Sequence, residues 1–115
     1  MAHKILLTHQ LPAEGLKLLE RDFEIKVPEN KHFSKQELEA LIPEYEVLIP
    51  VFGFEIGQDV IEKAENLKII ANYGAGYNNI DVKTATARGI LVTNTPETVI
   101  EPTAELAFAL LLALV

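Results

Sequence analysis

The feature that most constrains the fold is a regular alternation of short apolar runs with helix-like segments. Five runs of four to seven residues, most of them rich in branched aliphatic side chains, lie at residues 3–9, 23–27, 47–51, 67–71 and 90–93. Each is followed by a segment with helical apolar spacing or a helix start signal. Strands that alternate with helices in this way predict a parallel sheet joined by helical crossovers, not an antiparallel meander.

Local signals place the helices. Ser34 and Glu37 have the spacing of a capping box, with Phe33 and Leu38 positioned as a hydrophobic staple, and Pro43 ends that segment. A second start signal and a stop signal flank a shorter segment, since aspartate favours the cap position and glycine the left-handed position after a helix. These two residues are Asp81 and Gly89. Three more helices are expected from Pro12, from 57 to 64 and from 98 to 115.

Five strand-helix units with right-handed crossovers predict a flavodoxin-like, three-layer α/β sandwich. The most economical strand order is 2-1-3-4-5. The run at 23–27 alternates apolar and polar residues, as a half-buried edge strand does. With 115 residues, the chain is expected to form a single domain over 1–115.

Charge and composition exclude several classes of function. The chain has 17 acidic and 10 basic residues and a net charge of −7, with no cluster of Lys or Arg, so nucleic acid and anionic membranes are not expected partners. It contains no cysteine, which excludes disulfides and thiolate metal sites, and no metal site is expected. The longest apolar run, 106–115, has half of the roughly 20 residues that a membrane span needs. A cytoplasmic location is the expectation.

In a sheet of this type, ligands bind beyond the carboxyl ends of the strands. The candidate segments at that edge are 8–10, 51–54, 73–77 and 94–96. His9 is the only histidine among them. It reads either as a functional group or as an ordinary loop residue.

The segment Gly74-Ala75-Gly76 follows a predicted strand, as the start of a dinucleotide-binding fingerprint does. The pattern fails further on, because Asn79 occupies the place of the third glycine and no acidic residue stands about 20 residues later. Two other readings stay open. The glycines either form a tight turn, or let successive backbone N–H groups face a small carboxylate as an anion nest.

Four stretches of the second half resemble the D-isomer-specific 2-hydroxyacid dehydrogenases. They read LKIIANYGAGYNNID at 67–81, ARGI at 87–90, VTNTP at 92–96 and TAELA at 103–107. The first 66 residues agree with the family in pattern only. The resemblance implies an NAD(P)-dependent oxidoreductase that interconverts 2-hydroxy and 2-keto acids, with a flavodoxin-like substrate domain hinged to a Rossmann cofactor domain.

The resemblance also implies roles for individual residues. The backbone amides of Ala75 and Gly76 would hold the carboxylate of a small 2-hydroxy or 2-keto acid, and Thr103 would lie near the nicotinamide. The wall of the substrate pocket would consist of Val51, Phe52 and Gly53. The glycine-rich fingerprint and the catalytic arginine, glutamate and histidine of the family lie downstream of the matched stretches. We therefore expect the substrate-side segment of such an enzyme, with no catalytic residue, no bound NAD or NADP and no activity of its own.

The helix expected at 98–115 would lead into the cofactor domain. Its residues 103–115 leave no continuous polar face, and a helix that is apolar all round has to be buried. It either covers the edge of its own sheet or pairs with a second copy, and we predict a homodimer through residues 103–115. Two alternatives stay open: a stand-alone flavodoxin-like binding module and a purely structural scaffold.

Overall fold

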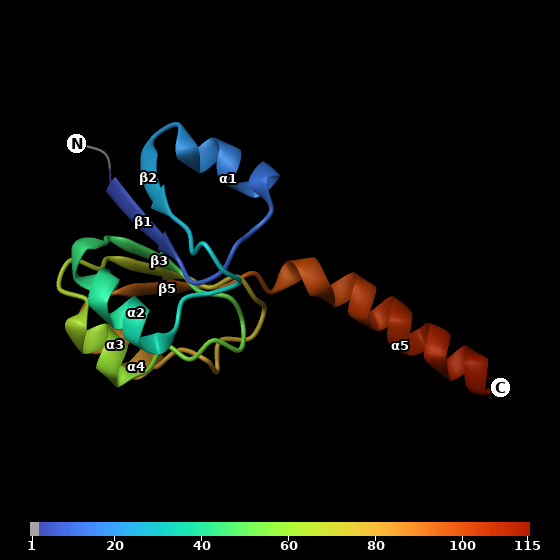
Figure 1. Cartoon of the computed structure of the whole chain (residues 1–115). Helices are drawn as coiled ribbons and strands as arrows, with labels where there is room; N and C mark the ends of the chain where they lie inside the picture. Colours follow the sequence, from blue (N-terminus) through green and yellow to red (C-terminus); the bar gives the residue numbers. More distant parts are fainter. Residues whose placement is uncertain (1–2) are drawn as a thin grey trace.

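A computed structural model describes residues 3–115 as an α/β domain with one long helix projecting from it (Figure 1). The sheet is parallel throughout, and its strand order is β2-β1-β3-β4-β5, as predicted. The second strand lies at one edge and alternates between half-buried and exposed residues. The strands are β1 (His3–Leu7), β2 (Phe23–Lys26), β3 (Val47–Ile49), β4 (Ile69–Ala71) and β5 (Leu91–Thr93).

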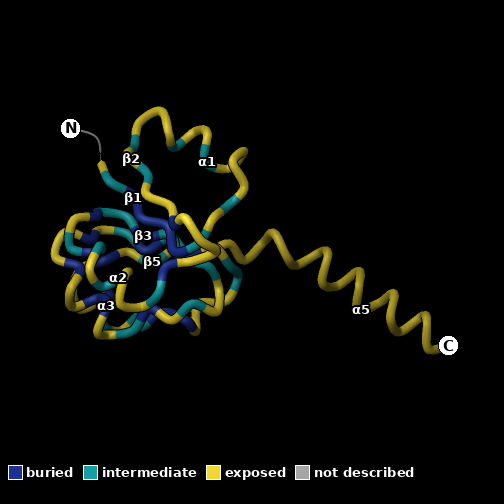
Figure 2. Tube along the Cα trace, in the orientation of Figure 1, coloured by how far each residue is buried: buried dark blue, intermediate teal, exposed yellow. Residues whose placement is uncertain are grey.

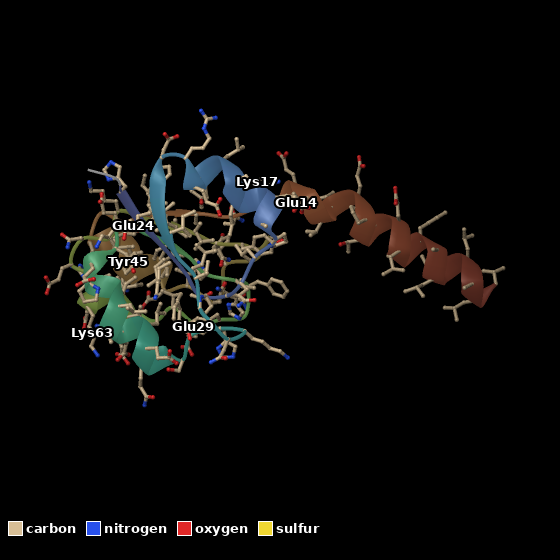
Figure 3. All side chains as sticks on the ribbon, turned by 45° about the horizontal axis from the view of Figure 1, so that its top comes forward. Glu14, Lys17, Glu24, Glu29, Tyr45 and Lys63 are labelled. Carbon is tan, nitrogen blue, oxygen red and sulfur yellow. The ribbon has the colours of Figure 1, made fainter. Side chains whose placement is uncertain are left out.

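The helices flank the sheet unequally. Three of them, α2, α3 and α4, pack side by side on one face, whereas α1 alone lies on the other, beside β2 (Figure 1). Figure 3 shows Glu14 and Lys17 on α1, which has no buried residue. The helices are α1 (Ala13–Glu20), α2 (Lys35–Leu41), α3 (Gln58–Lys63), α4 (Val82–Ala87) and α5 (Ile100–Leu114), with 3-10 turns η1 (Ile42–Glu44) and η2 (Glu97–Val99).

The core lies between the sheet and the three-helix layer. Leu6, Leu48 and Ile70, from the three central strands, are fully buried, and they belong to one cluster with Leu38 of α2 and Ile61 of α3. Figure 2 shows the buried residues concentrated here. The opposite face is covered less completely: Leu91 on β5 is 66% exposed. The second helical layer of the predicted sandwich therefore consists of α1 only.

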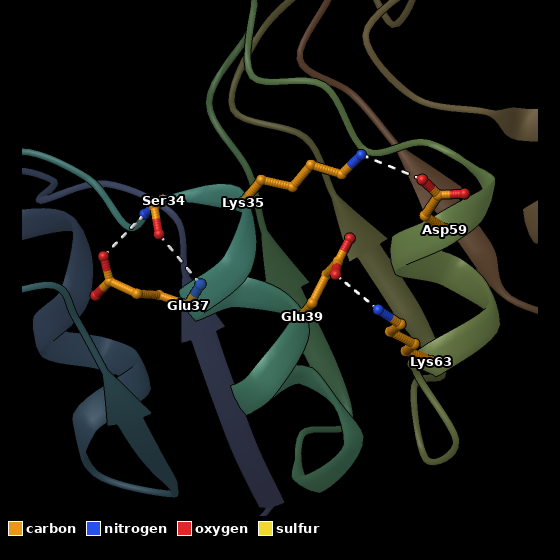
Figure 4. Close-up of polar contacts among 6 residues, drawn as sticks. All are labelled: Ser34, Lys35, Glu37, Glu39, Asp59 and Lys63. Carbon is orange, nitrogen blue, oxygen red and sulfur yellow. Dashed lines mark hydrogen bonds and ion pairs between the residues drawn. The ribbon is translucent and has the colours of Figure 1, made fainter.

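The predicted helix signals are confirmed. The Glu37 N–H donates to Ser34 Oγ (3.1 Å) and the Ser34 N–H donates to Glu37 Oε1 (3.3 Å), which completes the capping box (Figure 4). Asp81 caps α4 by accepting from the Thr84 N–H, and Gly89 has the left-handed φ of 73° expected of it. Two ion pairs, Lys35–Asp59 and Lys63–Glu39, join α2 to α3 in the same figure.

The terminal helix departs from one expectation. The α-helix begins at Ile100, not at 98, because residues 97–99 form the 3-10 turn η2 and Thr98 Oγ1 donates to the Thr95 carbonyl (3.2 Å). The helix does not cover its own sheet: every residue of α5 is exposed, and it contacts chiefly η2. Within residues 3–115, no helix is long and apolar enough to cross a membrane.

Candidate functional site

A cavity of about 660 Å³ opens where β3, β4 and β5 end, at the edge where the sequence predicts a site. Tyr73 is the only titratable side chain in its lining, so the lining brings no formal charge. Val51, which was expected in the wall, lies outside the lining: it is half-buried, and its N–H donates to Thr8 Oγ1 (3.2 Å). The lining residues are Phe52, Gly53, Tyr73, Gly74, Ala75, Gly76, Asn78, Thr95, Thr98 and Val99.

Two glycines shape the wall of this cavity. A Cβ atom on Gly74 would lie 2.6 Å from Cβ of Phe52, so only glycine lets these two loops approach so closely. Gly53 has a φ of 84°, the left-handed region that favours glycine. Phe52 contacts Gly74 on one side and precedes Gly53 in the chain, and 67% of its surface is exposed. The predicted wall residues Phe52 and Gly53 therefore do line the cavity.

The backbone after β4 has unpaired donors on two residues that line the cavity. Within the described chain, the N–H groups of Ala75 and Gly76 donate no hydrogen bond, whereas the Gly74 N–H is bound to the Asn72 carbonyl (3.0 Å). Unpaired successive N–H groups in a concave loop favour an anion. A carboxylate would satisfy both donors, and charge-assisted bonds of this kind are stronger than neutral ones. This geometry fits the anion-nest reading.

The same loop does not fit a dinucleotide. Asn79 is buried, and its side-chain nitrogen donates to Asn72 Oδ1 (3.2 Å) and to the Phe54 carbonyl (3.1 Å). A side chain thus fills the place where the fingerprint requires close packing. The Asp81 carboxylate also occupies the N-terminus of α4, where a pyrophosphate would have to bind.

His9 belongs to a separate cluster beside the cavity. Its ring lies 5.2 Å from that of His32 and 5.5 Å from Phe54, between ring centroids. Thr8 Oγ1 accepts from the Val51 N–H and also lies within hydrogen-bond distance, 2.8 Å, of Nδ1 of His9. Burial, with a smaller contribution from His32, lowers the pKa of His9. His9 does not line the cavity.

Thr103 is exposed on the second turn of α5 and does not line the cavity either. Thr98 and Val99 of η2 do line the cavity, directly before α5 begins. Sequence reasoning missed both of them, and it missed Asn72, which is 2% exposed. A polar residue directly after a buried strand was the available signal, since buried amides in proteins are almost always hydrogen-bonded.

Fold and site together define an open α/β domain with a cavity at the carboxyl edge of its sheet, lined by a loop that has two unpaired N–H groups. Residues 5–111 match the protein family described as "D-isomer specific 2-hydroxyacid dehydrogenase, catalytic domain". The chain therefore belongs to this family.

Relatives agree with this assignment. A glyoxylate reductase from Pyrococcus horikoshii is 43% identical over 114 residues, which make up 98% of this chain and 34% of that protein. Two solved structures superpose well. One is the PH0520 protein from Pyrococcus horikoshii (TM-score 0.85, 31% identity, 95% of this chain and 32% of that one). The other is an NADPH-dependent glyoxylate/hydroxypyruvate reductase from Sinorhizobium meliloti in complex with NADP and malonate (TM-score 0.76, 29% identity, 97% and 34%). The chain thus spans about a third of the length of these relatives.

Proposed function

We propose that this chain supplies the substrate-carboxylate site of an NAD(P)-dependent oxidoreductase that acts on small D-2-hydroxy acids and 2-keto acids. The observation that carries the proposal is the pair of unpaired N–H groups of Ala75 and Gly76 in the lining of an otherwise uncharged cavity. Two backbone donors can bind the carboxylate that all substrates of this class share, and the adjoining wall then faces the variable substituent.

The relatives support the same chemistry. The Sinorhizobium meliloti reductase is described in complex with NADP and malonate and, in a second structure, with citrate. Malonate and citrate are both carboxylates. Several relatives of comparable similarity are glyoxylate reductases, and glyoxylate is a small 2-oxo acid. These names describe those proteins, and for this chain a 2-keto acid is our proposal.

We assign this chain binding and orientation of the substrate, not proton or hydride transfer. Tyr73 is the one titratable side chain in the lining, and His9 lies outside it. Reduction of a ketone requires a hydride donor and an acid placed at the carbonyl oxygen. We therefore propose that the 115-residue chain is inactive by itself and that the NAD or NADP of a complete enzyme binds outside it, with Thr103 near the nicotinamide. The expected cytoplasmic location stays a prediction.

Titration with oxalate at constant ionic strength tests the carboxylate site. Amide resonances of Ala75 and Gly76 should shift with a saturable dependence on oxalate, because their protons acquire a charged acceptor. Oxamide, a neutral analogue of similar shape, serves as the control ligand and should cause no comparable shift. Absence of saturable shifts at millimolar oxalate contradicts the proposal.

We propose a homodimer through residues 103–115 as the second part of this function. Seven large apolar side chains of this stretch are all more than half exposed, around a helix of 15 residues that extends about 22 Å (Figure 3). Apolar surfaces of this extent are typical of interfaces. A second copy offers a surface of the same shape and chemistry. The side chains are Leu106, Phe108, Leu110, Leu111, Leu112, Leu114 and Val115.

Sedimentation velocity at tens of micromolar tests the dimer. The wild-type chain should sediment as a dimer, and the double variant F108E/L112E should sediment as a monomer because the charges would be buried in the interface. L18E, at an equally exposed leucine of α1, is the matched control and should stay dimeric. A monomeric wild-type chain contradicts this part of the proposal.

A further inference from the structure

The loop that carries the unpaired N–H groups is held in place by hydrogen bonds to its carbonyl oxygens. The Thr95 N–H donates to the Gly74 carbonyl (2.9 Å), and Asn94 Nδ2 donates to the Ala75 carbonyl (2.7 Å). Asn72 Nδ2 donates to the Gly76 carbonyl (2.8 Å). Three successive carbonyls therefore each have a hydrogen-bond partner elsewhere in the chain.

The contacts of these carbonyls also fix the direction of the neighbouring N–H groups. A trans peptide is planar, so the carbonyl of one residue and the N–H of the next point in opposite directions. Anchoring the Gly74 carbonyl sets the direction of the Ala75 N–H, and anchoring the Ala75 carbonyl sets that of the Gly76 N–H. The direction of these two N–H groups is thus set by the residues that hold the carbonyls of the same peptide planes.

The anchors come from a different part of the chain. Asn94 and Thr95 follow β5, whereas the anchored loop follows β4, 19 residues earlier for the Asn94–Ala75 pair. Thr95 acts through its backbone, which any residue except proline supplies. Asn94 acts through its side chain, so its identity matters: an asparagine amide donates to a carbonyl, and an aspartate or a leucine cannot.

We propose that Asn94 is a positioning residue for the carboxylate site: by holding the Ala75 carbonyl, it directs the Gly76 N–H toward the bound carboxylate. The inference rests on the proposed function, because it concerns how that site is aligned. Asn94 does not line the cavity and does not touch the ligand in this arrangement.

The test compares oxalate affinities of the wild-type chain, N94L and N94D. Leucine has nearly the same shape without the donor, and aspartate has the same shape with a charge that repels the carbonyl. We expect N94L to bind oxalate about tenfold more weakly, as misalignment of one charge-assisted bond implies. N94D should bind more weakly still, and in both variants the oxalate-induced shift of the Gly76 amide should shrink more than that of Ala75.

Asn66 provides a matched control for a purely structural role. Its Nδ2 donates to the Pro43 carbonyl at 2.8 Å, a bond of the same kind at the opposite edge of the sheet. N66L should reduce the unfolding temperature without changing oxalate affinity. An N94L variant that is folded and binds oxalate as tightly as the wild type overturns the positioning role alone. A wild-type chain that binds no oxalate overturns the proposed function and the positioning role with it.

Discussion

The domain over residues 3–99 and the helix α5 obey opposite rules of burial. In the domain, large apolar side chains such as Leu6, Leu48 and Ile70 are fully buried between sheet and helices. In residues 106–115, the later part of α5 and Val115 after it, the seven large apolar side chains are each at least 59% exposed. The longest helix of the described chain is thus also the one that its own domain leaves uncovered (Figures 1 and 2).

This difference teaches that apolar composition fixes whether a segment must be buried, not what buries it. Isolated helices of this length are marginal in water, and most helical stability in proteins comes from packing. The domain can supply packing for α2, α3 and α4 because a sheet face lies beneath them. Since α5 has no such surface in its own domain, we propose that a second copy of the chain stabilises it.

The largest effect should come from truncating a buried strand residue. L48A removes buried methyl groups from the central strand β3 and should lower the free energy of unfolding by about 2–5 kcal/mol. L111A makes the same change on exposed α5 and should alter domain unfolding by less than about 0.5 kcal/mol. Urea unfolding followed by a domain probe, such as the resonance of Ile70, provides the comparison. Equal losses in both variants would mean that α5 is part of the folded domain.

A smaller effect is expected where two loops touch at the site. G74A places a methyl group against Cβ of Phe52, at 2.6 Å before relaxation, and should cost about 1–3 kcal/mol through overpacking. Oxalate binding should also weaken, because Gly74 adjoins the free donors. A107G on α5 is the contrasting change and should leave both properties of the domain as they are. Unfolding and oxalate titrations on the two variants check this.

Removing the cap of a packed helix should cost less again. S34A removes the acceptor of the Glu37 N–H and should reduce the free energy of unfolding by about 1 kcal/mol. Thermal unfolding, with T98A as the control in η2, measures it. No loss in S34A would mean that the start of α2 is not coupled to domain stability.

The smallest effect concerns pH. Because folding lowers the pKa of His9 below its ordinary value of 6.5, the unfolded chain binds more protons just below that pH, and domain stability should fall as the pH drops through 6.5. H9Q should flatten this dependence. The pKa values of Glu46 and Asp81 are also lowered, by His3 and by Thr84, so losses from these carboxyls begin only as the pH falls toward 4.5.

The helix should not share this dependence, since α5 contains no histidine. Self-association should therefore stay constant between pH 7.5 and 5.5 while domain stability declines. A parallel loss of both, measured by sedimentation and by urea unfolding across this range, would contradict the separation of domain and helix.

Much of the fold could be predicted from local patterns. The strand order follows from five apolar runs, and the starts of α2 and α4 follow from Ser34 and Asp81, because caps act over three or four residues. For the segment Gly74-Ala75-Gly76 the local pattern left a tight turn and an anion nest open, and only the family resemblance named the donors of Ala75 and Gly76.

The remaining features depend on contacts that sequence spacing does not encode. Asn94 holds the Ala75 carbonyl across two loops, and Asn72 pairs with Asn79 in the interior. A side chain that bonds to backbone 19 residues away leaves no local pattern. The sequence left the course of α5 open for a related reason: its composition demands burial, but does not encode whether its own sheet or a second copy covers the helix.

The central claim is that strands β3 to β5 and the loops after them form a carboxylate site that does not depend on α5. Oxalate affinity of a shortened chain, residues 1–99, compared with that of residues 1–115 tests it most directly. The shortened chain retains every residue that lines the cavity. The two dissociation constants should agree within about twofold, as expected for separate regions without shared contacts. Loss of saturable binding in the folded shortened chain, or its absence in both chains, would contradict the claim.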